Sequence, residues 1–310
     1  MKNNILGTFI GSVVGDALGA PLEFYRRDKL NITDMTTGGI LNLRLGEWTD
    51  DTSMSICLAE SLIQNDFDLE DQMKKYILWY KEGKYCTREE CFDIGNATRF
   101  ALEDYIQNGN YISQNLSSLS SGNGSIMRLS PISIIYNSNE NSEGFLNLIN
   151  FSRKSSITTH PNKTCQDACA LLSLITNRAL QGYKKEEIFD INFDLLKKLS
   201  FSDSKVIDIA INSKNILEKE RNDISSSGYV IHSLEAAIWC FLKTDNFDDS
   251  VLLAANLGDD ADTVASITGQ ISGAYYGLNS INPNWIDNLY HKDYIINLSE
   301  KLFLKSSKTN

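Results

Sequence analysis

The sequence predicts an all-α protein: a single compact bundle of about a dozen helices that spans residues 1–310 as one domain. Three observations support this fold class. Apolar residues recur at intervals of three and four over most of the chain, which is the period of a half-buried helix. Two of these runs also carry glycine or alanine at every fourth position. Even residues 30–47, which are rich in glycine and threonine and irregular, offer at most one short strand.

Residues 5–20 form the first predicted helix, with glycine at positions 7, 11, 15 and 19. A glycine inside a helix costs roughly 1 kcal/mol relative to alanine, so four in register need a packing reason. A second ridge of small residues follows position 262, at Ala265, Gly269, Gly273 and Gly277. We expect both to be central helices in close contact with their neighbours, one option being each other.

The remaining elements follow in chain order. Pro21 ends the first helix and places Glu23 on a loop. Further helices are predicted over 53–65, 69–82, 88–107 and 163–181, as two surface helices within 184–222, after Ser227, and over 293–305. Residues 109–124, rich in asparagine, serine and glycine, form a loop. No repeat of fixed period and no linker is present, so one domain is expected.

Composition narrows the class of protein. With 29 basic and 40 acidic residues the net charge is −11, which argues against nonspecific nucleic-acid or membrane-surface binding. The need for ordinary solubility also explains this excess of acidic over basic residues. Six cysteines without a Cys-x-x-Cys pair and only three histidines argue against a zinc site. Asp16 interrupts the apolar N-terminus, so no cleaved signal is expected, and no stretch looks long and apolar enough to span a membrane. We expect a cytoplasmic monomer.

An acidic cluster stands at the start of a late helix. The stretch 256–265 places Asp259, Asp260 and Asp262 within four positions, followed by Thr263 and a helical apolar run. Carboxylates at a helix N-terminus cap free N–H groups and interact favourably with the helix dipole, which accounts for one or two of these three aspartates. Clustered carboxylates repel one another, so they shift their pKa values or bind a cation.

A second cluster repeats this pattern. Thr49, Asp50 and Asp51 come just before another amphipathic run. The two clusters together predict the halves of one site with enough oxygen ligands for two divalent ions. Oxygen ligands suit magnesium, manganese or calcium. An EF-hand is excluded, because neither stretch has the loop glycine and the distal glutamate of that motif.

Four blocks of sequence resemble one family. In order they are Gly11–Glu23 (GSVVGDALGAPLE), Trp48–Thr52 (WTDDT), Gly122–Arg128 (GNGSIMR) and Gly258–Thr263 (GDDADT). The chain resembles the ADP-ribosylglycohydrolases, which include the dinitrogenase-reductase-activating enzyme and the ADP-ribosylhydrolases. Any one block alone is weak, but four in order, spread over nearly the whole chain, are specific.

The resemblance implies a site, residue by residue. Two magnesium ions, with manganese as the alternative, would be held by Thr49, Asp50, Asp51, Asp260, Asp262 and Thr263. Glu23 would act as the acid/base beside them, with Asp260 and His160 as further catalytic candidates. ADP-ribose would contact Gly122, Asn123, Gly124, Ser125, Met127 and Tyr229, with Arg128 in support. Without the resemblance, Glu23 is an ordinary surface glutamate, His160 a capping residue and Tyr229 a core ring.

One departure from the family pattern affects the mechanism. Some members carry a catalytic aspartate three residues before the asparagine of the third block, where this chain has Ser120. Glu23 or a metal-bound water must then do that work.

The expected function is hydrolysis of the bond between ADP-ribose and an acceptor, most plausibly a protein side chain. The alternatives are a non-catalytic ADP-ribose-binding or structural member, as in a lens branch of the family, and an immunity protein that counters an ADP-ribosylating toxin. An unrelated phosphohydrolase of the His-Asp type is excluded, because no His-Asp pair occurs. The sequence does not identify the acceptor.

Overall fold

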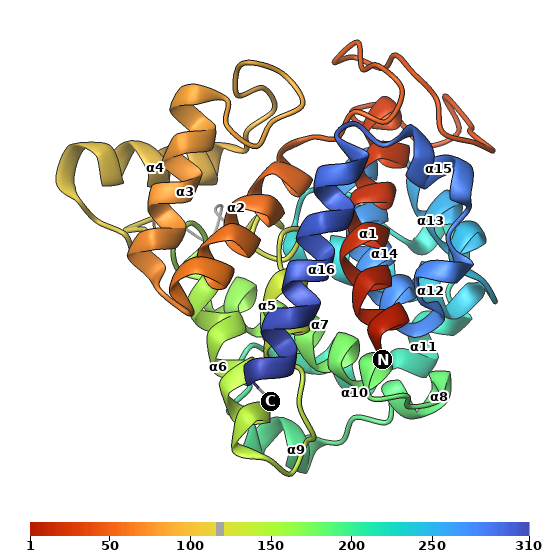
Figure 1. The fold of residues 1–310 in the computed structure, drawn as a ribbon. Coiled ribbons are helices and arrows are strands. Elements are labelled where there is room, and N and C mark those ends of the chain that lie inside the picture. The colour runs from red at the N-terminus through yellow and green to blue at the C-terminus, as the bar shows by residue number, and fades with distance from the viewer. Residues whose placement is uncertain (116–120, 310) are drawn as a thin grey trace.

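The computed structural model describes residues 1–115 and 121–309, which are all-α as predicted (Figure 1). No β-strand forms within these residues. Sixteen α-helices follow one another: α1 Lys2–Gly19, α2 Asp50–Asn65, α3 Leu69–Glu82, α4 Asn96–Asn108, α5 Ser130–Ile135, α6 Glu143–Ser156, α7 Lys163–Leu180, α8 Lys185–Ile188, α9 Phe193–Lys198, α10 Ser204–Ile211, α11 Ser213–Glu218, α12 Val230–Lys243, α13 Phe247–Ala255, α14 Ala261–Tyr276, α15 Pro283–Asn288 and α16 Lys292–Thr309. Short 3-10 helices form at Ala20–Leu22, Arg221–Asp223 and Leu278–Ser280.

Helices α1 and α14 run antiparallel through the middle of the molecule, and their small residues face each other (Figure 1). A Cβ atom placed on Gly7 would lie 2.5 Å from the carbonyl oxygen of Gly273, and one on Gly11 would lie 2.6 Å from that of Gly269. No side chain fits in this space. The expectation that the two glycine ridges pack tightly is confirmed, and each is the other's partner. We call this contact the α1–α14 seam.

The helix α1 is surrounded on all sides. Every residue from Ile5 to Gly19 is buried, and α13, α16 and α5 contact α1 around the seam. The segment Lys2–Leu22 is long and apolar enough to cross a membrane by length and composition, which corrects the expectation that no stretch is. In this fold its residues 5–22 are all buried inside the protein, as in a central core helix.

A second, smaller core lies to one side of the seam. Helices α2, α3 and α4 pack together there, at the left of Figure 1. Their shared apolar cluster is Met54, Cys57, Met73, Tyr76, Trp79, Cys86, Leu102 and Met127. This lobe and the seam meet at the start of α2, where one of the two acidic clusters lies.

The helix predicted over 88–107 is wrong in its first half. Gly83 ends α3 in the left-handed conformation with φ 63°, and Tyr85 and Asp93 also adopt positive φ, at 68° and 51°. Helices of L-residues do not accommodate such angles. The chain therefore runs as a loop to Gly95, the N-cap of α4. This loop carries Asp93 towards the acidic clusters.

Residues 184–222 form four short helices rather than the two that were predicted. Asn192 caps α9 by accepting from the N–H of Leu195, and Asp203 caps α10 by accepting from the N–H of Val206. Ser200, with φ 58°, turns the chain between them. Each cap starts a new helix where the apolar period alone would have continued the old one.

Candidate functional site

The two acidic clusters meet at one end of the seam. Asp50 and Asp51 occupy the first turn of α2, and Asp262 occupies the first turn of α14. The clusters are joined by two reciprocal bonds between residues more than 200 positions apart. Thr263 Oγ1 donates to Asp51 Oδ2 at 3.1 Å, and Thr49 Oγ1 lies 3.1 Å from Asp262 Oδ2. The clusters are therefore two halves of one site.

Asp16 of α1 fixes the start of α2. Its carboxylate accepts from the backbone N–H groups of Thr49 at 3.0 Å and Thr52 at 3.0 Å, and from the Thr52 hydroxyl at 2.6 Å. Burial raises the pKa of Asp16 to about 6, while these hydrogen bonds lower it. Asp16 thus caps α2 from another helix, which leaves Asp50 and Asp51 free for the site.

The Thr49 hydroxyl faces two carboxylates at once. Its oxygen lies 3.0 Å from Asp16 Oδ1 and 3.1 Å from Asp262 Oδ2. A hydroxyl has one proton, so it serves only one of these oxygens at a time. The second oxygen needs a proton of its own or a cation. Sequence analysis missed Asp16 as a supporting residue, although a charged residue inside a buried apolar helix was the available signal.

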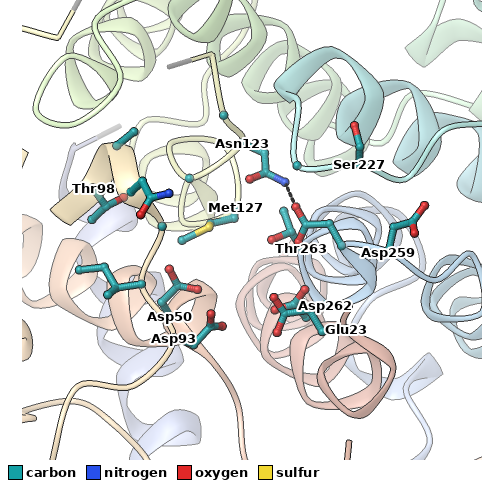
Figure 2. A pocket seen from close by; sticks show the side chains of 18 of the residues that line it. Glu23, Asp50, Asp93, Thr98, Asn123, Met127, Ser227, Asp259, Asp262 and Thr263 are labelled. Carbon is teal, nitrogen blue, oxygen red and sulfur yellow. Dashed lines mark hydrogen bonds between the residues drawn. The ribbon is translucent and has the colours of Figure 1, made fainter. Parts of the chain in front are cut away.

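A cavity of about 840 Å³ opens beside these carboxylates, and we call it the acidic cavity. Figure 2 shows Asp50 and Asp93 on one side of it and Glu23 and Asp262 across from them. Its lining is Glu23, Phe24, Asp50, Asp93, Ile94, Gly95, Asn96, Ala97, Thr98, Gly122, Asn123, Gly124, Met127, His160, Ser227, Gly228, Asp259, Asp260, Asp262 and Thr263. Thr49 and Asp51 are buried behind this lining.

The carboxylates of the site have raised pKa values. Burial is the largest cause for Asp50, Asp51 and Asp262, whose pKa values lie well above the ordinary range, and their like-charged neighbours add to it. Burial and then the charge of Asp93 raise the pKa of Glu23 to about 10. Such a cluster keeps protons at neutral pH unless a cation replaces them.

The site fits a divalent cation. Oxygens of Glu23, Asp260 and Asp262 lie within 4.8 Å of one another. Glu23 Oε2, Asp51 Oδ1 and Asp262 Oδ1 are buried and have no hydrogen-bond partner among the described residues. Buried oxygens without partners are costly, and a set made only of oxygens suits hard cations. The acidic cluster could therefore bind metal, in agreement with the ligand types predicted from the sequence.

Glu23 is not the solvated surface residue that its loop position would suggest. Its exposed fraction is 6%, and it directly follows the 3-10 helix Ala20–Leu22 at the end of α1. The backbone next to it is held by two 2.7 Å bonds, from the Phe24 N–H to the Asp259 carbonyl and from the Asp259 N–H to the Tyr25 carbonyl. The fold thus ties the Glu23 loop to the second acidic cluster.

Asp93 is a site residue that sequence analysis did not find. It lies on the loop before α4, lines the acidic cavity and faces Asp50 (Figure 2). Burial first, and then the charges of Asp16 and Asp260, raise its pKa to about 7. No sequence pattern indicates Asp93, because it is an isolated aspartate in a segment whose apolar period predicts a helix.

The loop from Gly122 forms the opposite wall of the site. Asn123 Nδ2 donates to Asp260 Oδ2 at 2.7 Å and to Ser233 Oγ at 2.8 Å, and so links the loop to the acidic cluster. Gly122, Gly124 and Met127 also line the cavity.

The other substrate candidates lie elsewhere. Ser125 is buried behind the loop and accepts from Ser156 Oγ at 2.9 Å. Tyr229 is outside the cavity lining and accepts from Lys205 Nζ at 3.0 Å through its hydroxyl. Contacts of these two side chains with a ligand stay predictions. Ser120 lies outside the described residues.

His160 lines the cavity, and its expected part in catalysis stays a prediction. It is 3% exposed, and burial together with the positive charge of Arg128 lowers its pKa to about 3. The imidazole is therefore neutral at physiological pH. A general acid or base works best with a pKa near the working pH.

The fold and the site define a class of protein: an all-α enzyme with an oxygen-lined acidic centre at the starts of two helices. The sequence profile of the ADP-ribosylglycohydrolase family matches residues 1–310, and the chain belongs to that family. It is an ADP-ribosylglycohydrolase enzyme, and its activity is the hydrolysis of ADP-ribose from protein.

Individual relatives agree with this assignment. The chain is 42% identical to the ADP-ribosylarginine hydrolase Tri1 of Serratia proteamaculans (strain 568), over 96% of this chain and 78% of that protein. It is 26% identical to the ADP-ribosyl-[dinitrogen reductase] glycohydrolase of Rhodospirillum rubrum, over 93% of this chain and 91% of that protein. A solved structure described as an ADP-ribosylglycohydrolase-related protein complex superposes with a TM-score of 0.81 at 34% identity, covering 98% of both chains.

Proposed function

We propose that this protein removes ADP-ribose from arginine side chains of proteins, with two magnesium ions held in the acidic cavity. The observation that carries the choice of acceptor is the charge of the cavity. Six carboxylates line it, and within the described residues no lysine or arginine does. Two divalent ions would balance four of these six charges, so the cavity would stay negative and favour a cationic acceptor, whereas a neutral acceptor gains nothing from the charge.

The mouth of the cavity adds a second feature suited to a guanidinium. The ring of Phe24 is 57% exposed and lines the cavity beside the exposed Asp259. A guanidinium stacks on an aromatic face and pairs with a carboxylate, and the stacking contributes about 0.5–2 kcal/mol. The relative at 42% identity is named as an ADP-ribosylarginine hydrolase, which supports the same acceptor.

The carboxylate oxygens of the two clusters are the ligands that we propose for the ions: Asp50, Asp51, Asp260, Asp262, with the hydroxyls of Thr49 and Thr263. Bound magnesium would supply Lewis-acid chemistry, neutralise these carboxylates and grip substrate oxygens. Manganese would fit the same oxygen set.

Glu23 is the residue to which we assign proton transfer. Glycosidic cleavage passes through a state with positive charge on the ribose, which nearby carboxylates such as Asp260 stabilise. Glu23 Oε2 has no hydrogen-bond partner in the part of the chain that the structure describes, so it would be open to hold a proton beside the breaking bond. Glu23 would give this proton to the leaving guanidine nitrogen and take one from the attacking water. The products are ADP-ribose and the unmodified arginine side chain of the protein.

A direct comparison of acceptors tests the proposal. Matched peptides that carry ADP-ribosyl-arginine or ADP-ribosyl-serine are incubated with the enzyme and magnesium, and the release of ADP-ribose is measured. We expect release from the arginine peptide to be at least about tenfold faster, equivalent to about 1.4 kcal/mol. Equal rates, or faster release from serine, would contradict the arginine assignment. If ADP-ribose is released at the same rate in EDTA, the proposal that the enzyme uses bound magnesium would be contradicted.

A further inference from the structure

His160 is connected to a buried arginine through one threonine hydroxyl. The Arg128 side chain is fully buried, and its Nη2 donates to Thr158 Oγ1 at 2.9 Å and to Thr159 Oγ1 at 2.8 Å. A guanidinium has only donors, so both hydroxyl oxygens must act as acceptors towards it. Thr159 Oγ1 also lies 2.8 Å from His160 Nδ1.

Each of the two threonine hydroxyls then donates its own proton to one identifiable acceptor. Thr158 donates its proton to the carbonyl oxygen of Ser155 at 2.9 Å. The Thr159 hydroxyl has no acceptor among the described residues except His160 Nδ1. If Nδ1 carried a proton instead, the buried Thr159 hydroxyl would lose its acceptor, at a cost of about 1–3 kcal/mol. Nδ1 is therefore the acceptor, and a neutral imidazole then carries its proton on Nε2.

The Nε2 edge of the ring faces the cavity wall formed by the glycines. A Cβ atom on Gly122 would lie 3.4 Å from His160 Nε2, and one on Gly124 would lie 2.7 Å from His160 Cε1. The ring approaches this closely because both residues are glycine. Nε2 has no hydrogen-bond partner within the described part of the chain, and the residue lines the acidic cavity.

We infer that Arg128 and Thr159 are positioning residues that hold His160 as a permanent Nε2–H donor towards an oxygen of the bound ligand. This inference rests on the proposed function for the identity of the ligand, ADP-ribose. The oxygen belongs either to the diphosphate or to the terminal ribose. His160 then transfers no proton in the reaction, and its role in the site is to orient the substrate. This binding role differs from the catalytic role expected for His160 from the sequence, which stays a prediction.

Two variants of Thr159 test the chain of bonds. Thr159→Val removes the hydroxyl at nearly the same volume, and Thr159→Ser keeps it. The protonation of both ring nitrogens is read from a long-range ¹H–¹⁵N spectrum of the imidazoles, in which the signals lost in His160→Ala belong to His160. Wild type and Thr159→Ser should show a protonated Nε2 and a bare Nδ1. Thr159→Val should show exchange between the two tautomers.

Calorimetry with ADP-ribose and with ADP gives the consequence for binding. Loss of one hydrogen bond should weaken the affinity of Thr159→Val for ADP-ribose by about 2–12-fold, while Thr159→Ser binds as wild type. An equal loss for ADP assigns the oxygen to the diphosphate, and a loss for ADP-ribose alone assigns it to the terminal ribose. A proton on Nδ1 in the wild type, or full affinity in Thr159→Val, would overturn the inference.

The two proposals fail separately. An enzyme that binds ADP-ribose and shows the Nε2–H tautomer, yet leaves ADP-ribosyl-arginine intact, contradicts the proposed function and supports the role of Thr159. An enzyme that hydrolyses ADP-ribosyl-arginine but whose His160 is protonated on Nδ1 supports the proposed function and contradicts the role of Thr159.

Discussion

The α1–α14 seam ends beside the acidic cavity at the start of α14, and the two regions are built in opposite ways. In the seam, backbone meets backbone, and the contact depends on the absence of side chains at Gly11, Gly269 and their neighbours. In the cavity, charged side chains converge, and several of their oxygens have no hydrogen-bond partner within residues 1–115 and 121–309. The seam is complete without a ligand, whereas the cavity is not. The seam should therefore determine stability, and the cavity should determine activity and the response to metal.

The largest effect is expected from Glu23, on the cavity side of this comparison. Glu23→Gln keeps the shape of the side chain but cannot transfer a proton, so turnover should fall by about 10²–10⁴-fold. Binding of magnesium and ADP-ribose, measured by calorimetry, should stay near that of the wild type. The exposed Glu82→Gln of α3 is the matched control. Full turnover in Glu23→Gln would leave the proton transfer to other groups.

The seam should show its effect in stability. Gly269→Leu would drive a branched side chain into the carbonyl of Gly11, and overpacking of this kind costs about 1–3 kcal/mol or more. Urea denaturation should detect it. Gly95→Ala serves as the control, because a Cβ there meets no atom within 4 Å and φ is −62°. A Gly269→Leu protein as stable as its parent would show that α1 and α14 can move apart without loss of stability.

Metal should stabilise the fold through the cavity alone. A ligand that binds only the native state adds about 2.7 kcal/mol to the free energy of unfolding at a hundredfold excess over Kd. Melts in EDTA and in millimolar magnesium should differ accordingly, and Asp262→Asn should narrow the difference while Gly269→Leu leaves it unchanged. Identical melts of the wild type in both buffers would rule out the metal site.

The metal-free protein should lose stability as pH rises. The pKa values of Asp16, Asp93 and Glu23 are raised in the fold, to about 6, 7 and 10. Above about pH 4 the unfolded chain releases protons that the native protein still holds, so each step up in pH favours unfolding until the native groups ionise too. In EDTA, Tm should fall between pH 5 and pH 8. With magnesium the fall should be smaller, because the ions replace the protons. A Tm in EDTA that rises over this range would contradict the raised pKa values.

The smallest effect is expected at the mouth of the cavity. Phe24→Ala removes the exposed ring, and loss of one cation–π contact should raise KM for an ADP-ribosyl-arginine peptide by about 2–30-fold with little change in kcat. Phe24→Tyr should behave as wild type. ADP-ribose itself lacks the acceptor, so its affinity should not change. A KM that stays constant in Phe24→Ala would remove the ring from acceptor recognition.

The sequence determined the parts of this protein that are local or periodic. The helical period predicted the fold class, and the spacing of glycines predicted a close helix contact because small residues at every fourth position have that one structural use. The clusters at Thr49–Asp51 and Asp259–Thr263 predicted two halves of a site, because carboxylates at two helix starts exceed what capping needs. Four motifs in order identified the family.

Only the tertiary structure decided how these parts meet. Asp16 and Asp93 act through contacts with residues far away in the chain. No local pattern marks an aspartate that caps another helix or one that lines a cavity. The tautomer of His160 depends on Arg128 reaching Thr159, and the burial of Glu23 depends on a loop tied to Asp259. Partners, burial and pKa values are properties of assembled neighbours, so the sequence supplied the functional groups and the fold determined the state of each.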